Sequence, residues 1–134
     1  MSRPITFADF QPGARMGEHI ETYDPRLAGT WQRIFGRTPQ EGADGPAEAA
    51  SIAVVLAMRA YLAVVTPRPP GNVQARQRFM LHTSPRPGEA VRTVISCAGK
   101  EIKRGGFHVE LQAQATGHGG RALFSGRMNL IWAA

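Results

Sequence analysis

The longest apolar stretch of the chain, residues 46–65, has no continuous polar face. Small and branched apolar residues fill most of its positions, and Glu48 and Arg59 are the only charged interruptions. Pro46 suits the first position of a helix, where a missing N–H costs nothing, and the proline-rich segment 66–71 ends the helix. A helix that is apolar on all sides must be surrounded by protein or by lipid. Because charge is expensive inside a bilayer, we predict a buried core helix over Pro46–Val65 rather than a membrane span.

After this helix the hydrophobic pattern changes to a period of two residues. Apolar and polar residues alternate from Phe107 to Thr116, which is typical of a strand with one buried face. Similar alternation predicts three further strands, and glycine- or proline-rich turns separate the four segments. The three further strands are Val73–Leu81, Glu89–Lys103 and Arg121–Ala133, and the turns are 85–88, 104–106 and 117–120.

Two shorter elements are predicted before the long helix. One is a strand over Arg15–Thr22. The other is a helix over Asp24–Phe35, in which Asp24 caps the first turn, Pro25 lies within it, and Gly36 follows the last one. The order is therefore strand, helix, long buried helix and four strands. An antiparallel sheet wrapped around one long central helix is the α+β arrangement called the hotdog fold, and 134 residues suit a single domain over residues 1–134.

Composition narrows the class of protein. The single cysteine, Cys97, cannot form an internal disulfide, and the first residues lack the apolar run of a secretory signal, so we expect a cytoplasmic protein. The formal net charge of +6 favours a polyanionic partner. We expect no nucleic-acid partner, because no recognition module or interleaving of basic and aromatic residues is present. We interpret this charge instead as a phosphate site, because the planar guanidinium group of arginine binds phosphate oxygens in pairs.

Several segments in this order resemble the MaoC-like acyl-thioester hydratases and dehydratases, a branch of the hotdog fold. The resemblance covers most of the chain and rests on the opening segment, the short helix, a later strand with its proline-glycine-acid turn, and one hairpin turn. These segments are residues 7–13, 24–36, 79–82, 85–89 and 103–106.

The sequence departs from that family at the catalytic motif. Family members carry a motif of the form G-D-x-N-P-x-H after the first helix, in which aspartate and histidine handle the proton and the water. The corresponding stretch here is Gly36-Arg37-Thr38-Pro39-Gln40-Glu41, which is one residue short. Arg37 stands where the aspartate belongs and Glu41 lies near the histidine position. Neither catalytic residue is retained.

The resemblance implies an acyl thioester, from acyl-CoA or an acyl carrier protein, in a tunnel between two subunits, with its carbonyl near the amino end of the central helix. Free backbone amides of Gly45, Ala47 and Glu48 would then polarise the carbonyl. Glu41 and Asp44 are candidate general bases, although Asp44 and Glu48 are also ordinary residues at a helix start. We take Arg76 and Arg78 as candidate contacts for the phosphates of CoA.

Three functions remain open. The protein is a hydratase or dehydratase with a replaced dyad, a thioesterase in which Glu41 or Asp44 directs water at the carbonyl, or a noncatalytic subunit that completes the tunnel of an active hotdog partner. We expect a homodimer, or a heterodimer with another hotdog subunit. No metal or other cofactor is expected, since the four histidines lack metal-ligand spacing.

Overall fold

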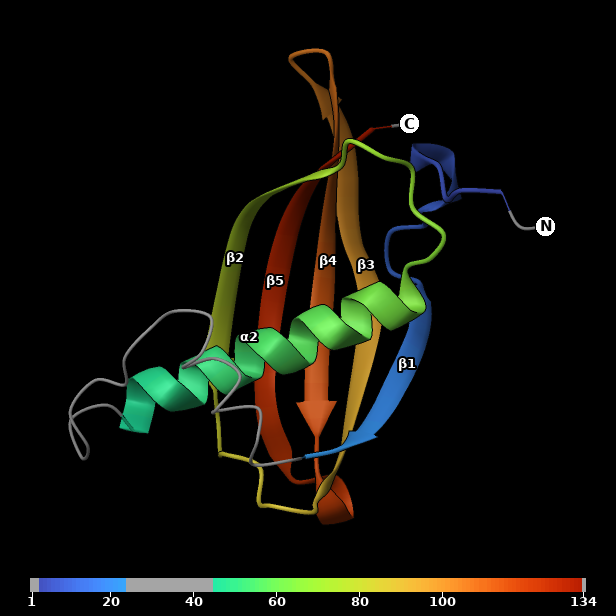
Figure 1. Ribbon diagram of the computed structural model, residues 1–134. Helices are drawn as coiled ribbons and strands as arrows, with labels where there is room; N and C mark the ends of the chain where they lie inside the picture. Colours follow the sequence, from blue (N-terminus) through green and yellow to red (C-terminus); the bar gives the residue numbers. More distant parts are fainter. Residues whose placement is uncertain (1–2, 24–44, 134) are drawn as a thin grey trace.

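The computed structural model describes residues 3–23 and 45–133, which form one five-stranded sheet and one long helix (Figure 1). The helix predicted over Asp24–Phe35 lies outside the described residues. The elements, in chain order, are the 3-10 turn η1 (Phe7–Asp9), β1 (Arg15–Thr22), α2 (Gly45–Val64), β2 (Val73–Leu81), β3 (Ala90–Lys103), β4 (Gly106–Thr116), the 3-10 turn η2 (His118–Gly120) and β5 (Ala122–Trp132).

The sheet is antiparallel throughout and has the strand order β1-β3-β4-β5-β2. The helix α2 lies across one face of the curved sheet, which we call the inner face; the opposite side is the outer face (Figure 1). The helix and strands predicted in the described residues are confirmed, with ends that differ by no more than one residue from the predicted ones. Both edge strands, β1 and β2, have one side without a neighbouring strand.

The core lies between α2 and the inner face. Side chains of α2 that are one turn apart meet alternating side chains of the central strands, as the two periods of the sequence predict. The small residues Ala113 and Ala115 of β4 are buried beside larger side chains of β3 and β5. The core residues of α2 include Leu56, Ala57, Ala60 and Tyr61, and those of the sheet include Val91, Ile95, Val109, Leu111, Met128, Leu130 and Trp132.

The prediction that protein surrounds α2 on all sides is wrong for the single chain. Arg59, Leu62 and Ala63 are exposed, and Leu62 keeps 47 % of its surface in solvent. The physical reason is that one sheet covers only one side of a helix that crosses it. The side of α2 that points away from the sheet is therefore exposed and partly apolar. Among the described residues, no helix combines the length and the hydropathy that a membrane crossing requires.

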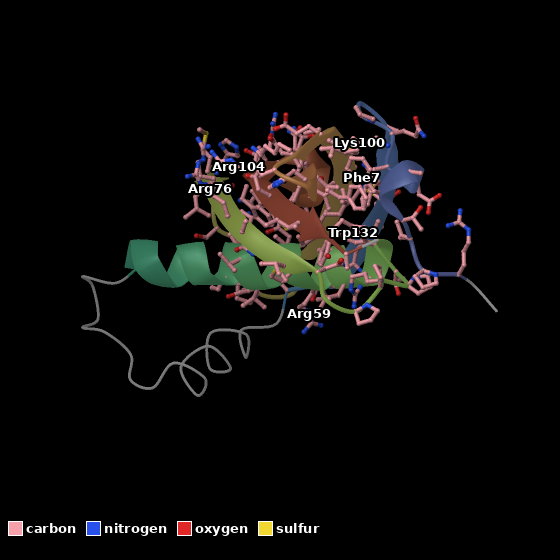
Figure 2. All side chains as sticks on the ribbon, turned by 90° about the horizontal axis from the view of Figure 1, so that it is seen from above. Phe7, Arg59, Arg76, Lys100, Arg104 and Trp132 are labelled. Atoms are coloured by element: carbon pink, nitrogen blue, oxygen red, sulfur yellow. The ribbon has the colours of Figure 1, made fainter. Side chains whose placement is uncertain are left out.

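The segment before β1 packs against the end of β5 and the β3–β4 hairpin. Phe10 is fully buried and meets Trp132 edge to face, with 4.9 Å between ring centroids. The indole Nε1 of Trp132 donates to the carbonyl of Ile5 at 2.7 Å. Phe7 stacks on Phe107, and Figure 2 shows Lys100 beside Phe7, where its Nζ donates to the Phe7 carbonyl at 3.0 Å. This segment therefore closes one end of the core.

Candidate functional site

The amino end of α2 is the first part of the candidate site. The helix begins at Gly45, one residue before the predicted start. In the first turn, the N–H groups of Gly45, Ala47 and Glu48 have no acceptor within the helix, and the helix dipole adds partial positive charge there. The structure thus places the first turn of a helix at the residues whose amides are proposed from the sequence, and their role toward a ligand stays a prediction. The candidate bases Glu41 and Asp44 lie outside the described residues.

The second part is a groove on the outer face, with a volume of about 1040 Å³. Arg76 and Arg78 both lie in it, because residues two apart in β2 point to the same side. Their partners in β5 are Asn129 and Arg127, which also line the groove. The structure therefore brings the two predicted arginines together but places them on the face opposite α2. A single ligand contacts both the amino end of α2 and the groove only by passing around the β2 edge.

The groove carries more positive than negative charge. Arg127 pairs with Glu110, and Lys103 with Glu101 at 3.2 Å. Within the described part of the chain, Arg76, Arg78 and Arg104 have no carboxylate partner, and Figure 2 shows Arg104 on the same side of the sheet as Arg76. Sequence reasoning missed Arg104, which reaches the groove because the tight turn of the β3–β4 hairpin holds it there in the left-handed backbone region, at φ 51°.

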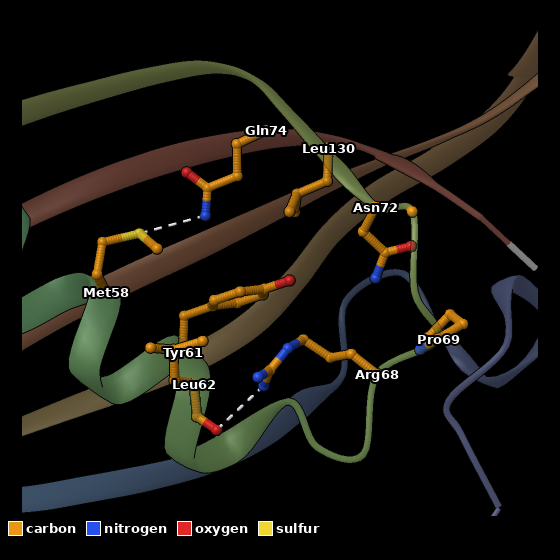
Figure 3. A pocket seen from close by; sticks show the side chains of 9 residues that line it. Met58, Tyr61, Leu62, Arg68, Pro69, Asn72, Gln74 and Leu130 are labelled. Atoms are coloured by element: carbon orange, nitrogen blue, oxygen red, sulfur yellow. Dashed lines mark hydrogen bonds between the residues drawn. The ribbon is translucent and has the colours of Figure 1, made fainter.

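A separate pocket of about 300 Å³ lies between the carboxyl-terminal half of α2 and the start of β2 (Figure 3). Arg68 crosses it: its Nη1 donates to the carbonyls of Leu62 and Val65 at 3.2 and 2.7 Å, and its guanidinium carbon lies 5.6 Å from the centre of the Tyr61 ring. Loss of solvent raises the pKa of Tyr61, and the nearby charge of Arg68 opposes that shift. The sequence analysis did not identify this pocket.

A cluster of three polar side chains joins β1 to α2. His19 and Glu21 lie two residues apart in β1 and face inward, with 3.2 Å between the imidazole Nε2 and the Glu21 carboxylate. The Nε of Arg59 from α2 donates to the same carboxylate at 3.1 Å. A carboxylate held between an arginine and a histidine can orient the imidazole, but none of these three residues lines the groove or the pocket that Arg68 crosses. Its evident role is to tie an edge strand to the helix.

Glu89 is the most buried acid of the described residues, with 2 % of its surface exposed. Its carboxylate accepts from the backbone N–H groups of Arg86 and His118, both at 2.8 Å, and pairs with Arg121. These donors lower the pKa of Glu89 from 4.5 to about 2. The cluster holds the turn after β4 against the start of β3, so its role is structural.

Other chemistry-bearing side chains are accounted for by packing or exposure. Burial raises the pKa of the Cys97 thiol, which disfavours a reactive thiolate. His82 is exposed just after β2. In residues 3–23 and 45–133, no group of three histidine, cysteine, aspartate or glutamate side chains is placed to hold a metal ion.

Comparison with solved structures gives the same architecture. The chain is similar to the R-hydratase PhaJ1 of Pseudomonas aeruginosa, with a TM-score of 0.70 and 15 % identity over 96 % of this chain and 86 % of that one. It is similar to the MaoC-like dehydratase of Rhodospirillum rubrum, with a TM-score of 0.71 and 14 % identity over 95 % and 96 %. The HadBC complex, a 3R-hydroxyacyl-ACP dehydratase of Mycobacterium tuberculosis, gives a TM-score of 0.66 and 16 % identity over 88 % and 93 %.

No protein-family model and no curated protein sequence matches the chain. The likenesses to these solved structures extend over nearly the whole chain. Because the sequence identities are low, they show the fold alone. The resemblance to MaoC-like proteins is thereby confirmed at the level of the fold, and the chain has the hotdog fold.

Proposed function

We propose that the protein binds acyl thioesters and acts as an enoyl-thioester hydratase or dehydratase in which other groups replace the usual aspartate and histidine. The observation that carries the proposal is the likeness over nearly the whole chain to an R-hydratase and a MaoC-like dehydratase. The first turn of α2, which begins at Gly45, supports the proposal with backbone amides that have no acceptor within the helix, as such chemistry uses.

In this proposal the thioester carbonyl accepts hydrogen bonds from the first turn of α2. Glu41 or Asp44 takes a proton from water, the water oxygen bonds to the β-carbon, and the electrons of the double bond move to the thioester oxygen as an enolate. The amides stabilise that charge. A proton then returns to the α-carbon, and the reverse sequence eliminates water.

A noncatalytic role as one subunit of a hotdog heterodimer is the second candidate. Arg37 stands at the position of the family's aspartate. A related structure, HadBC, is a complex. The exposed apolar side chains near the β2 edge, among them Val73, Met80 and Leu81, offer a surface for a second hotdog subunit, whether identical or not.

We further propose that Arg76 and Arg78 contact the phosphates of CoA. An arginine pair without carboxylate partners in the described structure is a suitable site for phosphate oxygens. Since this groove lies on the outer face, the nucleotide end of the ligand would lie across the β2 edge from the thioester end.

The decisive experiment incubates the purified protein with crotonyl-CoA and longer enoyl thioesters, following both loss of the enoyl absorbance and release of free thiol. Hydration without thiol release supports the proposal, and Glu41→Gln or Asp44→Asn should then lower the rate by about 10²- to 10⁴-fold. Glu18→Gln, at an exposed acid of β1 that does not line the groove, is the matched control. Thiol release without hydration identifies a thioesterase instead.

Binding without turnover would assign the noncatalytic role, in which case activity should appear only with a hotdog partner. Absence of binding to any acyl thioester would overturn the proposal as a whole.

The phosphate contacts have their own test. Arg76→Gln and Arg78→Gln should weaken binding of crotonyl-CoA and leave binding of crotonyl-pantetheine, which has no nucleotide, unchanged. Arg86→Gln removes one exposed positive charge outside the groove and serves as control. Equal effects on both thioesters would remove these arginines from the ligand site.

A further inference from the structure

The pocket between α2 and the start of β2, which we call the Tyr61 pocket, holds polar groups that the fold does not use. It is lined by apolar atoms of Met58, Leu62 and Leu130 and by the polar side chains of Tyr61, Arg68, Asn72 and Gln74. These residues come from the end of α2, the connection to β2, β2 itself and β5. The pocket belongs to the carboxyl-terminal half of α2, so it is distinct from the helix start discussed above.

One buried hydrogen-bond donor in the pocket has no partner among the described residues. The side-chain nitrogen Nδ2 of Asn72 is buried without an acceptor, although Oδ1 of the same side chain accepts from the backbone N–H of Ala133 at 2.7 Å. Figure 3 shows the hydroxyl of Tyr61, a second donor, and the Asn72 amide directed into the same space. A buried donor such as Asn72 Nδ2 is normally satisfied, so its presence here calls for an acceptor.

Arg68 adds charge to these two donors. One of its nitrogens donates to the carbonyls of Leu62 and Val65, which leaves the rest of the guanidinium for other acceptors. No carboxylate lines the pocket, and within the described part of the chain Arg68 forms no ion pair. The carbonyls at the helix end offset the positive charge only in part, since a helix end carries about half an elementary charge.

We propose that the Tyr61 pocket binds the carboxylate of a short aliphatic acid. The carboxylate oxygens accept from Tyr61, Asn72 and Arg68, and the aliphatic part lies against Met58, Leu62 and Leu130. The carboxylate belongs either to a free acid or to the far end of a carboxylated acyl thioester. This site is separate from the proposed catalytic one and stands whether or not the protein turns over thioesters.

The test measures binding of butyrate and of its uncharged analogue butyramide by calorimetry. Butyrate should bind, and butyramide should bind at least tenfold more weakly. Tyr61→Phe should weaken butyrate binding about tenfold, and Arg68→Gln by about ten- to a hundredfold, as expected for a neutral and a charged hydrogen bond. Arg86→Gln, which also removes one arginine charge but lies outside the pocket, should leave butyrate binding unchanged.

A second arm distinguishes the two sources of the carboxylate. If the ligand is a carboxylated thioester, hexadecanedioyl-CoA, whose chain is long enough to run from the start of α2 to the pocket, should bind more tightly than palmitoyl-CoA, and Arg68→Gln should remove the difference. If the two thioesters bind alike while butyrate binds as predicted, the ligand is a free acid. Both outcomes support a carboxylate site.

Two results would overturn the proposal. One is that neither butyrate nor hexadecanedioyl-CoA binding responds to Tyr61→Phe and Arg68→Gln, with both variants folded by circular dichroism. The other is that Arg68→Gln changes the oligomeric state without any change in carboxylate binding, because a second protein chain would then be the occupant of the pocket.

Discussion

At Gly126 in β5, the missing side chain makes room for the ring of Phe79 from β2. A Cβ at this position would clash with that ring and lie 3.1 Å from the carbonyl oxygen of Arg78. Gly126→Ala should therefore destabilise the fold by about 1–3 kcal/mol, the usual cost of overpacking. Urea denaturation measures this change. Gly99→Ala, where a Cβ would meet nothing within 4 Å, is the control, and equal losses in both variants would contradict the explanation.

The hydrogen-bond donors around the Glu89 carboxylate make the stability of the folded protein depend on pH. Its pKa is about 2 in the folded protein against an ordinary 4.5, so its stabilising effect is complete above pH 4.5 and disappears as the pH falls toward 2. We expect the urea midpoint of the wild type to fall through this range more steeply than that of Glu89→Gln. Glu101→Gln, an exposed acid, should retain the wild-type slope. Parallel curves for wild type and Glu89→Gln would show that the cluster has no such effect.

At the scale of elements, the joint between the amino-terminal segment and β5 depends on one indole. Trp132→Phe removes the hydrogen bond to the Ile5 carbonyl and part of the contact with Phe10. A loss of about 1 kcal/mol is expected from the hydrogen bond, with more from the smaller ring. Amide hydrogen exchange should accelerate at residues 5–10 before it does so in β3 and β4. Unchanged protection at residues 5–10 would mean that the segment is held by other contacts.

The helix and strands of the described residues could be predicted because each depends on the spacing of apolar residues within a short stretch of sequence. The predicted strands Val73–Leu81 and Arg15–Thr22 have the ends that the structure shows, the turn predicted over 117–120 contains η2, and the helix is displaced by one residue. The strand irregularity between Cys97 and Gly99 is not predicted from the sequence. Its backbone conformation depends on pairing with β4, which is distant in sequence.

The candidate site was less accessible to sequence reasoning. Arg76 and Arg78 lie on one side of β2 because they are two residues apart in a strand, but their position on the face opposite α2 depends on how the sheet packs. The position of Arg104 in the groove and the existence of the Tyr61 pocket depend on contacts between elements, which local sequence patterns do not reveal. Glu41 and Asp44 stay predictions, since they lie outside the described residues.

At the scale of the whole molecule, apolar side chains gather at the β2 edge and on the exposed side of α2. Met80 keeps 64 % and Leu62 47 % of its surface in solvent in the single chain. If a second hotdog subunit covers the β2 edge, Met80→Glu should shift the assembly toward monomer in analytical ultracentrifugation. Ile102→Glu, at a residue 65 % exposed on the β3–β4 hairpin, should not. A monomeric wild type, or equal behaviour of both variants, would exclude this interface.

The hydrogen bond from Trp132 to Ile5 joins positions 127 residues apart. Closing so long a loop adds little to the free-energy cost of the native state, because that cost rises only with the logarithm of loop length, but contacts at such separation slow folding. On the ribosome, Ile5 and Phe10 cannot meet Trp132 until β5 has been made. The nascent chain therefore carries Phe10 without its aromatic partner while the helix and the other strands are being synthesised.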